Sequence, residues 1–152
     1  MSSEVEWEIP HTNEGDKATV LQVLADYQAA FSGHSPQSTQ LFCHKPCMVI
    51  DAQRVIVLAS PTEIEAFFAS TMQNLEARGW HHSQWNEVSA EQLNDSAVLV
   101  STVAVRYMAD GEELERVGAT YVFRKTELGW KIAVTIAHPP NKVLHFNASP
   151  FS

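Results

Sequence analysis

Cysteine and basic residues are scarce in this chain, and each scarcity excludes a class of protein. Only Cys43 and Cys47 occur among 152 residues, which is too few for the disulfide framework of a small secreted domain. Lys and Arg number 10 against 18 Asp and Glu, and such an acidic surface repels nucleic-acid phosphates and anionic lipid headgroups. We therefore expect free thiols, and neither nucleic acid nor a membrane as a partner.

Long apolar segments and cofactor-binding motifs are also missing. No apolar run approaches the roughly 18 residues of a membrane helix, and the polar start Met1–Glu6 lacks the basic and apolar regions of a signal peptide. There is no glycine-rich loop of the phosphate- or dinucleotide-binding type. The segment Cys43–Cys47 has no second cysteine pair to complete a structural zinc site. The sequence indicates a cytoplasmic protein without a cofactor or a metal.

Three segments carry the signals of amphipathic helices. The first starts near Asp16 and ends by Gly33, with apolar residues three or four positions apart between them. Ser35 followed by Pro36 starts a short second helix, because a hydroxyl caps the free amides and proline fits the first helical position. The capping box Ser60-Pro61-Thr62-Glu63 starts the third.

The remaining pattern is the alternation typical of β-strands. Two short apolar runs, 48–51 and 55–58, predict a small hairpin between the second and third helices. From Trp80 onward, turn residues divide the chain into four antiparallel strands at about 80–91, 96–108, 114–125 and 130–138. The alternation predicts two sets of residues that each share one face of the sheet: Val117, Ala119, Tyr121 and Phe123, then Trp130, Ile132, Val134 and Ile136.

The order of these elements and four short motifs resemble the nuclear transport factor 2-like superfamily. The motifs are Val23–Phe31 with Gly33, Leu41-Phe42, Cys47–Asp51 and Gly129–Ile132. The resemblance implies one α+β domain over residues 1–152, with a core at about 16–138 and a tail at 139–152. Its expected form is a cone-shaped, curved antiparallel sheet wrapped over three helices, as in the cystatin-like and SnoaL-like folds.

Within this superfamily, ketosteroid isomerases use an aspartate at the end of the first strand as a general base and a helical tyrosine as an oxyanion donor. Asp51 and Tyr27 match these places, so the resemblance implies proton transfer next to a carbonyl group. The isomerase's second acidic donor has no counterpart in 118–122, which argues against steroid isomerisation itself. Each residue also has a structural interpretation, Tyr27 as a core aromatic and Asp51 as a turn residue.

An apolar pocket is expected around this pair. Its predicted ligand-binding walls include five aromatic residues: Phe31, Phe67, Phe68, Tyr121 and Trp130. Such walls exclude water and raise the pKa of an enclosed carboxyl group.

Histidine and arginine provide further candidates for this pocket. Because neighbouring strand residues point to opposite faces, only one of two adjacent histidines can face the pocket, and His82 is our candidate acid or base. His138 ends the last strand near the rim as a ligand-binding candidate. Arg106, if it points inward, would hold a carboxylate in two parallel bonds. The alternatives are surface histidines, and an outward Arg106 paired with Glu113 or Glu115.

Two classes of function remain open from the sequence. One is an enzyme that moves a proton on a small organic molecule, as isomerases, dehydratases and cyclases do; the other is a non-catalytic dimeric module for ligand binding or association. In both cases we expect a small apolar or aromatic ligand and a homodimer. The expected dimer contacts are Trp85, Leu99, Val103 and Val105 on the outer sheet face, and the tail residues Val143, Leu144 and Phe146. A raised pKa of Asp51 in the pocket would favour the enzyme.

Overall fold

The computed structural model describes residues 14–146; residues 1–13, including the start Met1–Glu6, and residues 147–152 lie outside the described part. The helices are α1 (Glu14–Ser32), α2 (Pro36–Gln40) and α3 (Pro61–Ala77), and a 3-10 turn, η2 (Pro140–Lys142), follows the sheet. The strands are β1 (Cys43–Ile50), β2 (Val55–Leu58), β3 (Trp80–Asn94), β4 (Ala97–Met108), β5 (Glu113–Thr126) and β6 (Gly129–His138).

Helices α2 and α3 begin where the capping signals predicted. The Ser60 hydroxyl accepts a hydrogen bond from the Glu63 amide at 3.2 Å, and the Glu63 carboxylate accepts one from the Ala59 amide at 2.9 Å. At α2, the Ser35 hydroxyl accepts a hydrogen bond from the Ser38 amide at 3.1 Å. These side chains satisfy amide groups that have no partner within the first helical turn.

Helix α1 begins at Glu14, so Asp16 lies inside its first turn and does not cap it from outside. The Asp16 carboxylate accepts a hydrogen bond from Gln92 Nε2 of β3 at 3.1 Å. Further along α1, the Leu24 carbonyl accepts a hydrogen bond from Trp85 Nε1 at 3.0 Å. Both contacts attach the helix to β3.

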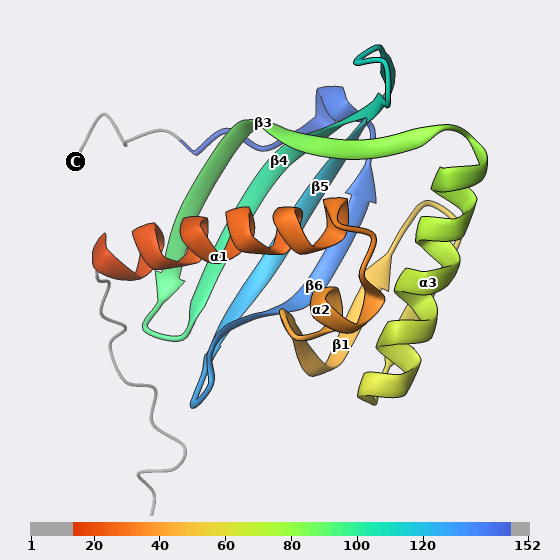
Figure 1. Ribbon diagram of the computed structural model, residues 1–152. Coiled ribbons are helices and arrows are strands. Elements are labelled where there is room, and N and C mark those ends of the chain that lie inside the picture. Colours follow the sequence, from red (N-terminus) through yellow and green to blue (C-terminus); the bar gives the residue numbers. More distant parts are fainter. Residues whose placement is uncertain (1–13, 147–152) are drawn as a thin grey trace, which may run out of the picture.

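The six strands of the described residues form one sheet in the order β2-β1-β6-β5-β4-β3. The last four strands pair antiparallel in sequence order, as predicted, and β1 pairs antiparallel with β2. β1 and β6 run parallel, so the sheet is mixed. Figure 1 shows α1 crossing one face of the sheet, with α3 beside the β1 end and α2 between them. The architecture is the α+β fold that the sequence predicted.

A β-bulge in β6 corrects the predicted strand faces. Phe123 pairs with Ile132, whereas Val122 pairs with Val134, so one extra residue stands between these two pairs. Trp130 and Ile132 share the inner, helix-covered face, as predicted. Val134 and Ile136 lie on the outer face, contrary to the prediction, because an inserted residue reverses the alternation.

Strand β3 contains further irregularities with the same effect. Its register against β4 shifts between Trp80 and His82 and again between Asn86 and Ser89. Glu87, within the second shift, has a φ of 56°. Alternation counted from the start of β3 therefore misplaces the residues that follow each shift.

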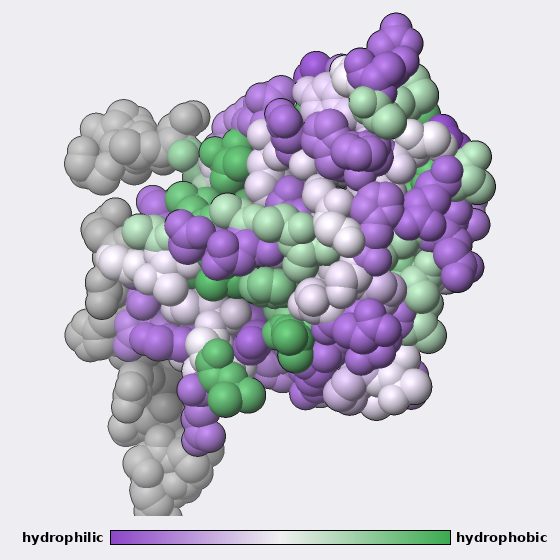
Figure 2. All heavy atoms as spheres, in the orientation of Figure 1, coloured by the Kyte–Doolittle hydropathy of each residue, from purple (hydrophilic) through white to green (hydrophobic). Residues whose placement is uncertain are grey.

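The main hydrophobic core lies between the helices and the inner face of the sheet. Val20 and Ile64 from the helices and Val98, Val100 and Phe123 from the sheet each have an exposed fraction of 0%. Figure 2 shows the outside of this helical side, where hydrophobic residues form small patches among hydrophilic ones. The apolar faces of the helices are therefore directed mainly inward.

The segment after β6 packs across the outer sheet face. Val143 forms a small hydrophobic core with Val103 and Val105, which are 1% and 2% exposed. The Leu144 amide donates a hydrogen bond to Ser101 Oγ at 2.8 Å. Part of the surface expected to contact another subunit is thus covered by the chain's own tail.

Trp85 also differs from its predicted position on the dimer surface. It pairs with Ala104, and both residues line the interior between sheet and helices. Its indole N–H is bound to the carbonyl of Leu24 in α1. Trp85 is therefore an inner-face residue, because the register shift near the start of β3 changes the alternation.

Candidate functional site

A cavity of about 240 Å³ lies between the helices and the inner face of the sheet. It is lined mainly by apolar side chains and includes Asp51, whose side chain is 33% exposed at the cavity edge. Seven predicted site residues line it: Tyr27, Phe31, Asp51, Phe67, Phe68, Arg106 and Tyr121. The fold therefore brings together most of the predicted pocket.

Tyr27 of α1 stands at the centre of the aromatic wall. Its ring centroid lies 6.0 Å from that of Tyr121 and 6.3 Å from that of Phe68. Burial raises the pKa of both phenols, and the partner phenol raises that of Tyr27 further. Both groups are therefore neutral at ordinary pH and are suited to donate hydrogen bonds.

Arg106 is the charged group that β4 directs into this aromatic cavity. Its Nη1 lies 3.2 Å from a carboxylate oxygen of Glu115, which stands directly opposite on β5. Glu115 also accepts hydrogen bonds from both terminal nitrogens of Arg78, at 2.5 and 3.3 Å. The expected pairing of Arg106 with Glu115 thus exists, but on the inner face. Two guanidinium groups share one carboxylate, which leaves a net positive charge at this place.

The Nε of Arg106 is buried and has no hydrogen-bond partner within residues 14–146. Burial lowers the pKa of Arg106, and the charge of Glu115 opposes this effect. A buried N–H without a partner costs about 1–3 kcal/mol relative to a hydrogen-bonded one. Arg106 therefore carries a buried donor without a partner in the wall of an otherwise apolar cavity.

Asp51 is held by its own turn. One carboxylate oxygen accepts hydrogen bonds from the amides of Gln53 and Arg54 at 2.8 and 3.0 Å, and the other lies 3.4 Å from Arg54 Nε. The bond from Gln53 and then those from Arg54 lower the pKa of Asp51, although desolvation opposes them. The carboxylate is thus stabilised in its ionised form, which makes it a weaker base.

His82 lies on the outer face of the sheet and does not line the cavity. It pairs with Tyr107 of β4 and stacks on its ring, with centroids 5.2 Å apart and an interplanar angle of 20°. The shift after Trp80 gives the inward place to Ser83, which stands opposite Arg106. The expectation that His82 faces the pocket is therefore wrong in this structure, because of the β3 irregularity.

His138 also lies on the outer face. Its Nε2 is 2.8 Å from Thr120 Oγ1, which is 2.8 Å from Ser101 Oγ. Its Nδ1 is 2.8 Å from the carbonyl oxygen of Pro139, which can only accept a hydrogen bond. In the neutral ring, Nδ1 therefore carries the proton and Thr120 donates to Nε2. The bulge in β6 turns His138 away from the cavity in which it was predicted.

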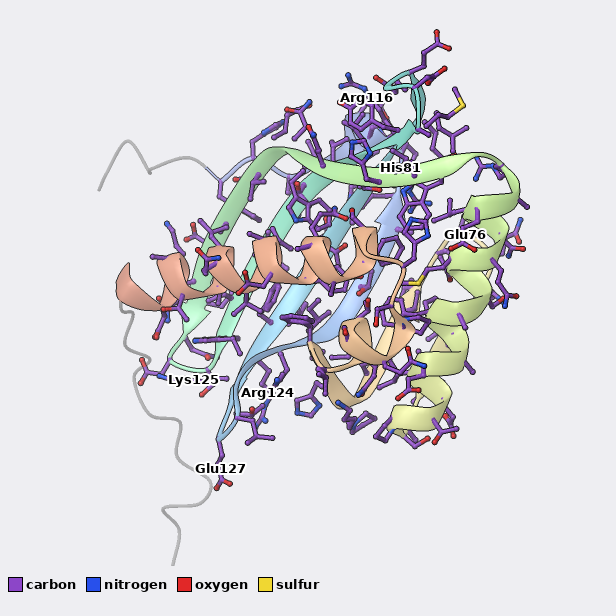
Figure 3. The ribbon with its side chains drawn as sticks, viewed as in Figure 1. Glu76, His81, Arg116, Arg124, Lys125 and Glu127 are labelled. Atoms are coloured by element: carbon purple, nitrogen blue, oxygen red, sulfur yellow. The ribbon has the colours of Figure 1, made fainter. Side chains whose placement is uncertain are left out.

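Trp130 is buried in the core but does not line the cavity. Its exposed fraction is 5%, and Lys125 Nζ lies 5.9 Å from the centroid of its ring. It lies near the tip of the β5–β6 hairpin, where Figure 3 shows Arg124, Lys125 and Glu127. Trp130 thus closes one end of the core.

Two cavity residues that the sequence analysis did not assign to the site are Cys43 and Cys47. They are 5% and 7% exposed. The Cys47 thiol raises the pKa of Cys43, and the Cys43 thiol lowers that of Cys47. Burial raises both pKa values, and the Lys45 charge lowers both. Cys47 is four residues before Asp51, so strand alternation predicts that both side chains point inward. The inward direction of Cys43 could not be predicted in this way, because the register of β1 against β6 shifts between Cys43 and Met48.

No group of three or more His, Cys, Asp or Glu side chains in residues 14–146 is arranged to hold a metal ion. No helix in the same range is both long and apolar enough to span a membrane.

Solved structures with the same fold cover most of the chain. A Nostoc punctiforme protein of unknown function with a cystatin-like fold gives a TM-score of 0.71 at 10% identity, covering 93% of this chain and 99% of its own. An NTF2-like protein from Novosphingobium aromaticivorans gives 0.69 at 11% identity, with 84% of each chain covered. A dehydratase candidate of the NTF2-like family from Streptomyces avermitilis gives 0.64 at 16% identity, covering 84% and 98%. At these identities the likeness establishes the fold alone.

Sequence comparison identifies the family more directly. Among curated proteins, none matches this chain. A family model described as NTF2-like protein (DUF6841) matches residues 16–140, which is most of the chain and includes every strand of the sheet. The chain therefore belongs to this family of NTF2-like proteins.

Proposed function

We propose that the cavity binds a small aromatic or apolar carboxylic acid. The observation that carries this proposal is the buried Arg106, which lines the cavity and whose Nε has no hydrogen-bond partner within the described residues. A carboxylate is the complementary ligand, since it accepts two parallel hydrogen bonds from a guanidinium group. Glu115 already accepts from Arg78, so the local charge still favours an anion.

The aromatic wall supports the remainder of such a ligand. Tyr27, Phe31 and Phe68 supply apolar surface for a ring or a short chain. Burial raises the pKa of Tyr121, so its hydroxyl keeps its proton and can act as a second donor beside Arg106. A volume of about 240 Å³ suits a compact molecule, since pockets for drug-sized ligands begin at roughly 300 Å³.

Binding accounts for the geometry better than proton abstraction by Asp51. The amides of Gln53 and Arg54 occupy one oxygen of this carboxylate and hold its pKa low. A base that removes a proton next to a carbonyl group needs a pKa nearer the working pH. We therefore assign Asp51 to the turn between β1 and β2, and the non-catalytic interpretation is the stronger one.

A homodimer remains part of this proposal. Val55 and Val57 of the edge strand β2 are 60% and 58% exposed. Val134 and Ile136, which the β6 bulge turns outward, are half-buried on the same sheet. These residues offer apolar area that a second copy would cover, on the part of the sheet away from the tail. Sedimentation analysis of Val57→Lys, expected to be monomeric, tests this contact against the wild type.

Calorimetric titration with matched acids and amides tests the binding proposal. Benzoate and cinnamate should bind the wild type at least about tenfold more tightly than benzamide and cinnamamide, because a charge-assisted bond contributes about 1.5–3 kcal/mol. Arg106→Met should lose this preference, and Arg116→Met should keep it. Equal affinity for acids and amides, or an unchanged Arg106→Met variant, would contradict the proposal.

A second experiment separates binding from catalysis. A small unsaturated ketone is incubated in D₂O with the wild type and with Asp51→Asn, and deuterium next to the carbonyl group is followed by NMR. We expect no exchange above the buffer rate with either protein. Exchange with the wild type alone would restore Asp51 as a general base.

A further inference from the structure

Cys43 and Cys47 form a buried pair of thiols in the wall of the same cavity. Both side chains lie on the inner face. Cys43 stands opposite Ile132 and Met48 stands opposite Val134, so five steps along β1 correspond to only two along β6. In a regular strand, residues four apart have Cα atoms separated by about 13 Å, which is beyond the reach of a disulfide. The register shift between Cys43 and Met48 changes this spacing. The local irregularity of β1 thus brings together two thiols that a straight strand would separate.

We propose that Cys43 and Cys47 are an oxidisable dithiol, in which Cys47 attacks a hydroperoxide and Cys43 then closes an intramolecular disulfide. The site is independent of acid binding, because neither thiol contacts a carboxylate ligand in that proposal. Both cysteines line the cavity, so a disulfide between them would alter its wall. The proposed oxidant reaches the pair through the cavity, which extends to the partly exposed Asp51 on the same strand face.

The reaction balances with a hydroperoxide as the oxidant. The Cys47 thiolate attacks the terminal peroxide oxygen, the O–O bond breaks, and the alcohol leaves after taking up a proton; Cys47 becomes a sulfenic acid. The Cys43 sulfur then attacks the Cys47 sulfur, the S–O bond breaks, and water leaves with the Cys43 proton. Two thiols lose two electrons in total, and the hydroperoxide gains them.

The surroundings assign different roles to the two cysteines. Cys47 is four residues from the partly exposed Asp51 on the same face of β1, whereas Cys43 is eight residues away, so an oxidant that enters beside Asp51 meets Cys47 first. The Cys43 thiol and then the Lys45 charge lower the pKa of Cys47, although burial raises it. The Cys47 thiol and then burial raise the pKa of Cys43, so it keeps its proton. Because the thiolate is the nucleophile, Cys47 reacts first and Cys43 resolves the product.

Intact-mass measurement after treatment with hydrogen peroxide tests the pair in the whole wild-type chain. We expect a product lighter by two hydrogen atoms, the loss of both titratable thiols, and recovery of both by a reducing agent. A peptide map should then link Cys43 to Cys47. Two thiols that survive peroxide in the folded protein but react in urea would overturn the proposal, since the fold would then protect them.

Single-cysteine variants test the assigned roles. Cys43→Ser should retain a Cys47 that forms a sulfenic acid, trapped as a dimedone adduct, whereas Cys47→Ser should leave Cys43 with at least a tenfold slower reaction. Equal rates in the two variants would refute the assignment. Thermal unfolding of each variant shows whether it is folded, and if either is not, the comparison is made on the wild type by mapping the first adduct at limiting peroxide. A first adduct on Cys43 would refute the assignment in the same way.

Discussion

Replacement of Arg106 by methionine should leave the protein at least as stable as the wild type while removing its preference for acids. The Arg106 Nε is buried without a partner in the described part of the chain. A free N–H in this position costs about 1–3 kcal/mol, and methionine removes it. The methionine side chain is unbranched and adaptable, so it can fill the space of the arginine stem.

The opposing effect is the loss of the ion pair with Glu115. The two side chains are 18% and 25% exposed, and a partly solvated pair contributes about 0–1 kcal/mol. Glu115 keeps both hydrogen bonds from Arg78 after the substitution, so no carboxylate is left unpaired. We therefore expect the free energy of unfolding to rise by about 1 kcal/mol.

Urea unfolding followed by the fluorescence of the four tryptophans measures this difference. Arg116→Met is the matched control, because Arg116 pairs with Glu113 in the same hairpin and is 44% exposed. Figure 3 shows Arg116 at the β4–β5 end of the sheet, far from the β5–β6 hairpin. The control should change stability by less than about 0.5 kcal/mol. A loss of more than about 1 kcal/mol in Arg106→Met would refute the reasoning and make Arg106 a structural residue.

Three further substitutions test the local structure. Ser60→Ala removes the cap of α3 and should cost about 1 kcal/mol in urea unfolding; no loss would show that the cap is dispensable. Gly129 has a φ of 103°, so Gly129→Ala should lower the free energy of unfolding by about 1 kcal/mol. An unchanged midpoint of urea unfolding would contradict that conformation. The His34 pKa is raised: burial lowers it, but hydrogen bonds to the His81 carbonyl and the Glu76 carboxylate raise it more. The stability that His34 contributes should therefore be full below about pH 6.5 and be lost as pH rises through the folded pKa. The difference in unfolding free energy between wild type and His34→Gln should shrink over that range, and a constant difference would argue against the linkage.

Short-range signals predicted the elements of the fold well. Ser35 and Ser60 each precede a proline, and both cap helices where expected, because capping depends only on residues within one turn. The last four strands were placed within a few residues of their observed bounds, since alternation records burial of one sheet face. Tyr27 and Tyr121 line the cavity as predicted. Each lies on the periodic apolar face of its helix or strand, which is the face that the pattern predicts to be buried.

Residues beyond a bulge were predicted poorly. The inserted residue in β6 reverses the direction of Val134, Ile136 and His138, and the shift near the start of β3 reverses that of His82 and Trp85. A bulge cannot be recognised from the pattern of polar and apolar residues when both faces of the sheet are partly covered, because both faces then carry apolar residues. The register is then set by contacts with neighbouring strands.

The sequence alone determined the helices, the strands and the apolar character of the cavity, because these depend on local hydrogen bonding and on periodic burial. Only the tertiary structure decided which charged and nucleophilic groups enter that cavity. Arg106 faces inward because of its pairing opposite Glu115 and Ser83, and the approach of Cys43 to Cys47 accompanies a shift in the pairing of β1 with β6. Such pairings join residues far apart in the chain, and a change of register by one residue would turn each of these side chains to the opposite face.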